Sequence, residues 1–139
     1  MNTYDIRRYM TSWPSCDNVV ISLMDASYHD TYEPEQIGIV EVRIDKTGEH
    51  KGDAYIWNLH VKEEYRGKGM GRVLLNDAIW VAEENDCKSA TLDWSIEEAP
   101  KWVLDWYCRN GFDEREFGRG CAFMEKKLKA RTVDKLNDV

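Results

Sequence analysis

The sequence predicts an α/β fold, equally described as α+β, in which helices flank one mixed central sheet. Three observations support this prediction. The first half of the chain holds strand-like apolar segments, the middle alternates strand and helix patterns, and the end returns to strands. With 139 residues, of which 42% are hydrophobic, the chain is long enough to bury a core, and we expect a single domain over residues 1–139.

The first half of the chain predicts three strands after an ambiguous start. Residues 1–18 leave the first element open, because YDIRRYM suits a short helix or a strand and TSWPS breaks it. Residues 18–25, NVVISLMD, predict a strand rich in β-branched side chains. Residues 37–45 and 54–61 predict two more strands, joined by a turn at 46–53 that forms a hairpin. The last of these is apolar at most positions, so we expect it to be central and covered on both faces.

The second half predicts two helices and three strands. Apolar residues recur at helical spacing over residues 70–84, which indicates an amphipathic helix. Residues 89–94 predict a strand, and residues 99–110 predict a second helix with proline in its first turn and glycine after its end. Residues 112–117 and 121–128 predict two closing strands around GRG. The charged tail after them is expected to be helical or frayed.

Charge and cysteine usage limit the partners. The chain has 26 acidic and 19 basic residues and a net charge of −7, the opposite of a typical nucleic-acid binder. We therefore expect no nucleic-acid partner and favour a cationic one, such as an amine. The four cysteines form no C-x-x-C pair, which argues for reduced thiols and against a metal site. The absence of a signal segment or a long apolar run predicts no membrane contact and a cytoplasmic location.

The segment RGKGMG, residues 66–71, is where the third strand passes into the first helix. Three interpretations compete: a glycine turn with solvated charges, a dinucleotide fingerprint, and a cradle for a pyrophosphate. The fingerprint G-x-G-x-x-G is absent, and no Gly-Lys-Ser/Thr follows for a Walker A loop. Exposed amides at the positive end of a helix bind anions, so this position favours the cradle. Its residues would be Arg66, Gly67, Lys68, Gly69, Met70 and Gly71.

Two motifs resemble the GCN5-related N-acetyltransferase (GNAT) family. V-x-x-x-Y-R-G-K-G-M-G-R-x-L-L, beginning at Val61, is similar to its acetyl-CoA-binding motif, Q/R-x-x-G-x-G/A. WYCRNGF, from Trp106 to Phe112, resembles the Y-x-x-x-G-F that ends the helix after its fifth strand, and FMEKKL resembles its last strand. The resemblance covers about Ile37 to Leu128. It implies transfer of the acetyl group of acetyl-CoA to a primary amine of a protein lysine or N-terminus, a polyamine or a small amine.

The resemblance also implies where acetyl-CoA, as cosubstrate, would bind. In the family the strand before the glycine segment is splayed from its parallel neighbour, so its backbone groups are free for a ligand. Backbone groups of Leu59 and Val61 would bond the pantetheine arm and polarise the acetyl carbonyl. The pyrophosphate would lie against residues 66–71, with Arg72 as a further contact.

Two residues are candidates for the chemistry. By resemblance, Tyr107 points at the coenzyme sulfur and protonates the leaving thiolate; the alternative is an aromatic ring packed on the inner face of its helix. An alkyl ammonium has a pKa of about 10.4, so a base is useful at neutral pH. Asp53 stands where many family members carry a glutamate, and would act through a water; the alternative is that it ends the KGD turn. Tyr55 and Glu63 are lesser candidates.

Two departures from the family pattern bear on the acceptor. No asparagine stands near the start of the last helix, where the sequence reads SIEEAPK. Residues 1–18 are too few for the family's opening strand and two helices, so the N-terminal region is shortened and the acceptor groove is either open or completed by a second subunit in a homodimer. A catalytically silent coenzyme-binding or protein-interaction module is the competing hypothesis. Most tryptophans are expected in the core, with Trp94 alternatively lining the acceptor slot.

Overall fold

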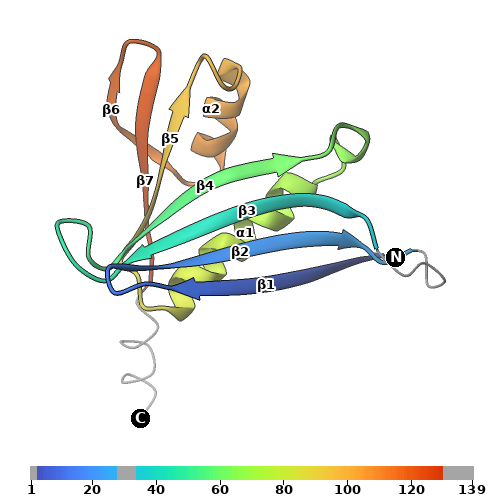
Figure 1. Cartoon of the computed structure of the whole chain (residues 1–139). Helices are drawn as coiled ribbons and strands as arrows, with labels where there is room; N and C mark the ends of the chain where they lie inside the picture. The colour runs from blue at the N-terminus through green and yellow to red at the C-terminus, as the bar shows by residue number, and fades with distance from the viewer. Residues whose placement is uncertain (1–2, 28–33, 130–139) are drawn as a thin grey trace.

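The computed structural model describes residues 3–27 and 34–129. These residues form a seven-stranded sheet in the order β1-β2-β3-β4-β5-β7-β6, with a short 3-10 helix and two α-helices (Figure 1). Every neighbouring pair is antiparallel except β4 and β5, so the expected mixed sheet is confirmed. The bounds are β1 Tyr4–Ser12, β2 Cys16–Asp25, β3 Gln36–Asp45, β4 Asp53–Val61, η1 Glu63–Tyr65, α1 Met70–Glu84, β5 Ser89–Ser95, α2 Lys101–Arg109, β6 Asp113–Gly118 and β7 Cys121–Lys127.

The ambiguous first segment is the edge strand β1. A tight turn joins it to β2, in which the Trp13 N–H donates to the Cys16 carbonyl at 2.8 Å. No helix precedes β2 within the described residues. The hairpin between β3 and β4 and the two closing strands are also confirmed. The predicted tail falls mostly at residues 130–139, outside the described residues.

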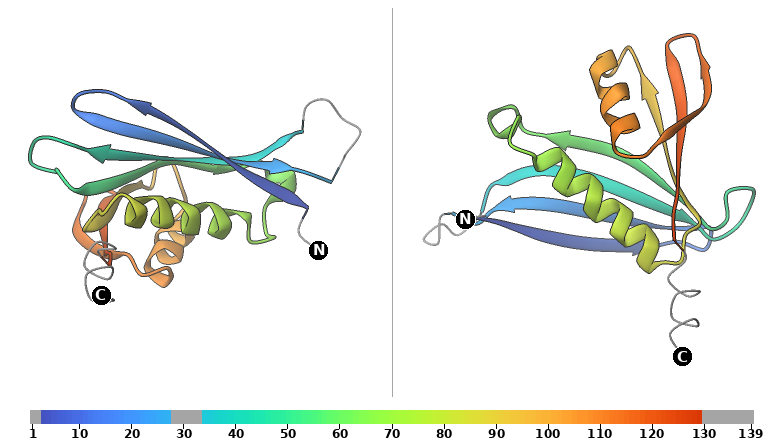
Figure 2. Two further views of the ribbon diagram at one scale, coloured as in Figure 1. Left: turned by 90° about the horizontal axis from the view of Figure 1, so that it is seen from below. Right: turned by 180° about the vertical axis from the view of Figure 1, so that it is seen from behind.

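The helices cover one face of the sheet. In the view from below, α1 and α2 lie on the same side of β1 to β4 (Figure 2). The expectation that residues 54–61 are covered on both faces is wrong, because Ala54 and Ile56 are buried against the helices whereas Trp57 on the opposite face is 42% exposed. The reason is that no helix of the described chain lies on that outer face. None of the described helices is long and apolar enough to cross a membrane.

The strands β4 and β5 are joined over only part of their length. Parallel pairing links Asp53, Ala54 and Tyr55 to residues 89–91, and no pair follows. Beyond this point β5 stays paired with β7 while β4 stays paired with β3, so the sheet divides into two parts (Figure 1). The chain enters α1 after β4 and α2 after β5, and both helices therefore begin beside the opening.

One ion pair fastens the edge strand β1 to α1. Arg8 donates from Nε to Asp77 Oδ2 at 2.9 Å and from Nη2 to Oδ1 at 2.6 Å. Its guanidinium also lies 4.7 Å from the centroid of the Trp80 ring. Asp77 is 9% exposed, so its carboxylate depends on this partner for its solvation.

We predict that Arg8→Ala lowers the free energy of unfolding by about 1–3 kcal/mol, because it leaves a buried carboxylate without its cation. We expect a loss near the lower end of this range, because the Arg8 side chain is 39% exposed and water screens part of its interaction with Asp77. Urea denaturation measures the change. Arg7→Ala is the matched control: Arg7 lies 3.5 Å from Asp5 with both side chains exposed, and its loss should cost about 0–1 kcal/mol. Equal costs for the two variants would contradict the proposed role of the Arg8–Asp77 pair.

Candidate active site

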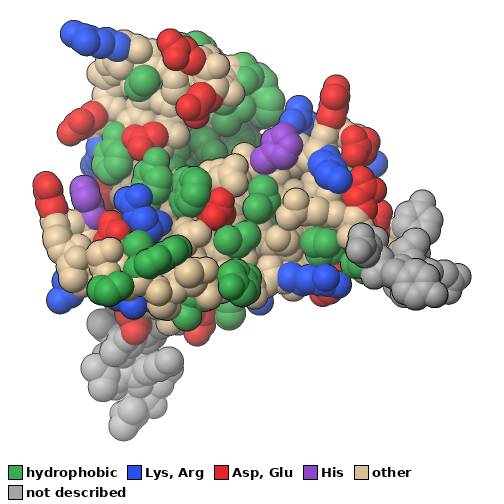
Figure 3. Space-filling view, viewed as in Figure 1, with side chains coloured by type: hydrophobic (Ala, Val, Ile, Leu, Met, Phe, Trp, Pro, Cys, Tyr) green, Lys and Arg blue, Asp and Glu red, His purple; other side chains and the backbone are tan. Residues whose placement is uncertain are grey.

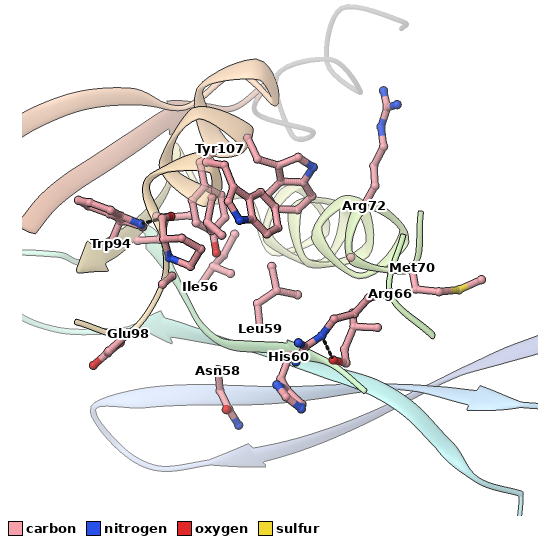
Figure 4. A pocket seen from close by; sticks show the side chains of 18 of the residues that line it. Ile56, Asn58, Leu59, His60, Arg66, Met70, Arg72, Trp94, Glu98 and Tyr107 are labelled. Carbon is pink, nitrogen blue, oxygen red and sulfur yellow. Dashed lines mark hydrogen bonds between the residues drawn. The ribbon is translucent and has the colours of Figure 1, made fainter. Parts of the chain in front are cut away.

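A cleft of about 960 Å³ lies where β4 and β5 part. Its walls come from the second half of β4, the glycine segment with the start of α1, the end of β5, and α2. Figure 3 shows it as a hollow with hydrophobic side chains on its walls, and Figure 4 shows it from close by. Of the predicted site residues, Leu59, Val61, Arg66, Gly67, Gly69, Met70, Gly71, Arg72 and Tyr107 line it, whereas Lys68 and Asp53 do not.

The glycine segment presents unused backbone amides to the cleft. Gly69 precedes α1 with φ 83°, a conformation that glycine adopts without strain. The amides of the first helical turn have no acceptor within the helix, and no side chain caps them. Within residues 3–27 and 34–129, none of the N–H groups from Gly67 to Arg72 donates a hydrogen bond. These donors and the helix dipole make this end of the cleft suited to an anion.

The three basic side chains of the segment differ in position. Arg66 folds back and donates from Nε to the Val61 carbonyl at 2.8 Å. Arg72 lines the cleft with its backbone end, and its side chain points away from the cleft in Figure 4. Lys68 lies over the Tyr65 ring, with Nζ 5.9 Å from the centroid. Arg66 is thus the basic group held at the cleft, and the other two can reach an anion only by moving.

Tyr65 fixes the position of the segment. Its hydroxyl donates to Asp25 Oδ2 at 2.8 Å. The Ser27 N–H donates to Oδ1 of the same carboxylate at 2.9 Å. Hydrogen bonds from Ser27 and Tyr65 lower the pKa of Asp25, which keeps it ionised and able to accept both. The sequence shows the tyrosine beside the motif but not its distant partner at the end of β2.

The backbone of β4 faces the cleft at Leu59 and Val61. The Val61 carbonyl points there because it accepts the bond from Arg66, and the next N–H, of Lys62, points to β3 and donates to the Ile37 carbonyl at 2.9 Å. Since backbone directions repeat at every second residue of a strand, Leu59 also directs its N–H and carbonyl into the cleft. The Val61 carbonyl is already bonded to Arg66. The backbone N–H and carbonyl of Leu59 and the N–H of Val61 are the groups that face the cleft and remain for a ligand.

Tyr107 projects from α2 into the middle of the cleft. Its ring packs against those of Trp106 and Phe112, with centroids 5.3 Å and 5.9 Å away. Its hydroxyl points toward β4 in Figure 4 and has no hydrogen-bond partner in the described part of the chain. Burial raises the pKa of Tyr107, so the phenol is protonated at neutral pH. Tyr107 therefore both packs its ring against its neighbours and keeps a hydroxyl proton that it can donate.

Asp53 lies outside the cleft. It begins β4 and lines a separate pocket of about 320 Å³, with Asp45 and His50 among its neighbours. His50 Nδ1 is 3.8 Å from Asp53 Oδ2. The carboxylates that line the cleft are those of Asp93 and Glu98, neither of which the sequence reasoning identified. The structure thus brings Tyr107 together with these two carboxylates and not with Asp53.

Asp93 connects the two pockets, because it lines both. Its Oδ2 accepts a hydrogen bond from the Tyr55 hydroxyl at 2.8 Å. Burial, with a smaller contribution from Asp93, raises the pKa of Tyr55 to about 12, so Tyr55 donates to Asp93 at any ordinary pH. The signal for Asp93 in the sequence is an acidic residue inside the otherwise apolar strand SATLDW, since charged residues are rarely placed in buried strands.

The tryptophans are mostly outside the core, contrary to expectation. Trp94 is buried, and its indole N–H donates to the Pro100 carbonyl at 3.3 Å. It also lines the cleft, so Trp94 is both a core residue and part of the cleft wall. Four of the six are at least 42% exposed: Trp13, Trp57, Trp80 and Trp102. Trp57 and Trp102 line the cleft, so two of the exposed indoles belong to the site.

The chain is similar to known proteins in its sequence and in its fold. The model of the acetyltransferase (GNAT) family matches residues 5–112. An uncharacterized N-acetyltransferase of Methanocaldococcus jannaschii is 32% identical over 75 residues, 54% of this chain and 32% of that protein, so the chain spans about a third of that relative's length.

Solved structures share the fold. An acetyltransferase of Bacillus cereus has a TM-score of 0.65 and 23% identity over 81% of this chain and 74% of its own. A spermidine N-acetyltransferase of Vibrio cholerae, in complex with CoA and spermine, has a TM-score of 0.62 and 21% identity over 81% of this chain and 67% of its own. With the family model covering most of the chain, the resemblance of the two motifs is confirmed, and the protein belongs to the GNAT acetyltransferase family.

Proposed function

We propose that the protein is an acetyl-CoA-dependent N-acetyltransferase that acts on a primary amine. One observation carries this proposal: residues 67 and 69–72 and the Tyr107 hydroxyl line the same cleft, and neither their amides nor this hydroxyl has a hydrogen-bond partner among the described residues. The amides suit the charged end of the coenzyme, and the phenol suits its thioester end. Family membership supports the same activity.

The coenzyme would lie along β4. Its pyrophosphate would accept hydrogen bonds from the amides at the start of α1, where the helix dipole favours negative charge. Arg66 lines the same end of the cleft and would add a cation. The pantetheine arm would pair with the backbone of Leu59 and with the Val61 N–H, as a strand does at a free sheet edge. In this direction the thioester would lie near Tyr107.

Transfer then needs four events. The amine nitrogen attacks the thioester carbonyl, backbone N–H groups of β4 stabilise the oxyanion, and the departing thiolate takes a proton from Tyr107. The amine must also lose a proton to a base. Asp53 remains our predicted base, acting through water from the adjoining pocket, while Asp93 and Glu98 are the carboxylates at the cleft itself.

The acceptor is proposed to be cationic. Asp93 and Glu98 place carboxylates on the cleft wall, and the exposed Trp57 ring offers a face to a cation. The net charge of −7 points the same way. The spermine bound to the Vibrio cholerae structure is a polyamine of this kind. A protein lysine, an N-terminus or a small amine would satisfy the same groups.

One observation favours the silent alternative, a module that binds the coenzyme or a protein without turnover. Arg66 occupies the Val61 carbonyl, which the pantetheine arm would otherwise use. A turnover assay on a panel of amines, with detection of free thiol, separates the two functions, since only an enzyme releases coenzyme A in proportion to the amine consumed.

We predict that Gly69→Glu abolishes acetyl-CoA binding measured by calorimetry, because it places a carboxylate at the anion site and strains the amides that form it. Gly48→Glu is a matched control. Gly48 has φ 84° and Gly69 φ 83°, and neither has an atom within 4 Å of an added Cβ. Only Gly69 lies at the cleft, so the control should bind like the wild type. Unchanged affinity of Gly69→Glu would remove the cradle from the proposal.

We predict that Tyr107→Phe lowers kcat by about 10²-fold or more, the usual loss when a proton donor is removed. Acetyl-CoA affinity should change little. Because burial raises the pKa of Tyr107, wild-type kcat should show no descending limb below about pH 10. Tyr9→Phe, on an exposed ring of β1, is the control. A Tyr107→Phe enzyme with the wild-type rate would exclude this residue as the acid.

We predict different kinetic effects for the three carboxylates. Asp93→Asn and Glu98→Gln should raise the KM for the amine by about tenfold, because each loses a hydrogen bond between charged groups. Asp53→Asn should lower kcat and leave this KM unchanged. Full kcat in Asp53→Asn would assign the base to another group, and an unchanged amine KM in both other variants would exclude them from the acceptor site.

A further inference from the structure

The strand β4 contains an extra residue at the cleft. Glu41 of β3 pairs with Trp57, whereas Ile39 pairs with His60, so Asn58 and Leu59 together stand opposite one residue of β3. This is a β-bulge. Asn58 has φ 55°, a left-handed conformation that asparagine adopts more easily than most residues but that still costs free energy.

The bulge decides which side chains face the cleft. Before it, Ala54 and Ile56 face the helices. After it, Leu59 points toward Tyr107 while Asn58 points to the opposite side (Figure 4). If β4 kept all its residues but paired regularly with β3, the residues after Trp57 would slip by one position, and their side chains would turn to the other face of the sheet. The backbone groups alternate in the same way, so those of Leu59 would also turn out of the cleft.

A hydrogen-bonded clamp on the outer face holds the bulge. Asn58 Nδ2 donates to Glu41 Oε2 at 2.8 Å. Asn18 Nδ2 donates to the other oxygen, Oε1, at 2.9 Å, and the Trp57 indole N–H donates to Asn18 Oδ1 at 3.2 Å. Both oxygens of Glu41 are therefore engaged, and three adjacent strands are joined at the bulge. Hydrogen bonds to a charged acceptor are among the stronger ones, so Glu41 can offset the cost of the left-handed residue.

We propose that Glu41 is a positioning residue for acetyl transfer, because its carboxylate keeps Asn58 left-handed and so holds the backbone of Leu59 toward the coenzyme. The expected effects on coenzyme binding and on kcat rest on the proposed function. The conformational part stands on the geometry of β3 and β4 alone. Glu41 does not line the cleft, and acts through Asn58.

The test is Glu41→Ala measured in two backgrounds, wild type and Asn58→Gly. Glycine adopts the left-handed conformation without cost, so the bulge in Asn58→Gly no longer needs the clamp. In the wild-type background, Glu41→Ala should weaken acetyl-CoA binding and lower kcat by about tenfold each. Added to Asn58→Gly, it should change either value by less than twofold relative to Asn58→Gly itself. Glu41→Gln keeps one of the two acceptor oxygens and should recover part of the loss. It also tests the clamp if Glu41→Ala does not fold.

Hydrogen exchange at the Lys62 amide, which donates to the Ile37 carbonyl in the β3–β4 pairing after the bulge, gives a readout that needs no activity. The exchange should be faster in Glu41→Ala than in the wild type. The double variant Glu41→Ala/Asn58→Gly should exchange at the same rate as Asn58→Gly alone. Equal effects of Glu41→Ala in both backgrounds, or none in either, would overturn the proposal. If the wild type fails to bind acetyl-CoA, the proposed function fails, while the exchange data still decide whether Glu41 holds the bulge.

Discussion

The interruption of pairing between β4 and β5 is the constraint on which the site depends. Only three residue pairs join the two strands before they separate. Unpaired strand edges normally attract other strands, and this one is protected inside a cleft between two helices. The helices approach each other there: an added Cβ at Gly71 would lie 3.8 Å from the Trp106 ring. The free edge, the amides of α1 and the phenol of α2 thus meet because the sheet divides.

The one-sided covering of the sheet explains the chemistry of its outer face. Val19, Ile21 and Leu23 of β2 face α1 and are buried, whereas the residues between them are partly exposed. On that exposed face the polar partners lie across strands, as Asn18 and Glu41 do. Such pairs stabilise a solvated sheet surface without an apolar cover. The same face carries Asp93 and Trp57, so a cationic acceptor would meet polar and aromatic groups without an enclosing wall.

The sequence predicted what depends on local pattern and missed what depends on register. The helices and the glycine segment follow from spacing within one element, and the resemblance of WYCRNGF to a family motif implied the role of Tyr107. Asp93 does not follow from such spacing, because its place in the cleft depends on how β5 lies beside β4. Asp53 was chosen by its place at the start of β4, yet the cleft begins at Ile56, roughly 10 Å further along a strand that rises about 3.3 Å per residue. The tryptophans were assigned to the core because composition does not show which face of a sheet lacks a cover.

The bulge was also present in the sequence, as a break in alternation. The inward apolar residues of β4 include Ile56 and Leu59, three positions apart instead of two, with Asn58 between them. A bulge also increases the local twist of its strand. It follows Tyr55, the last residue of β4 that pairs with β5, by three positions, so the added twist acts where β4 turns away from β5. One inserted residue can therefore account for both the direction of the Leu59 backbone and the opening into which it points.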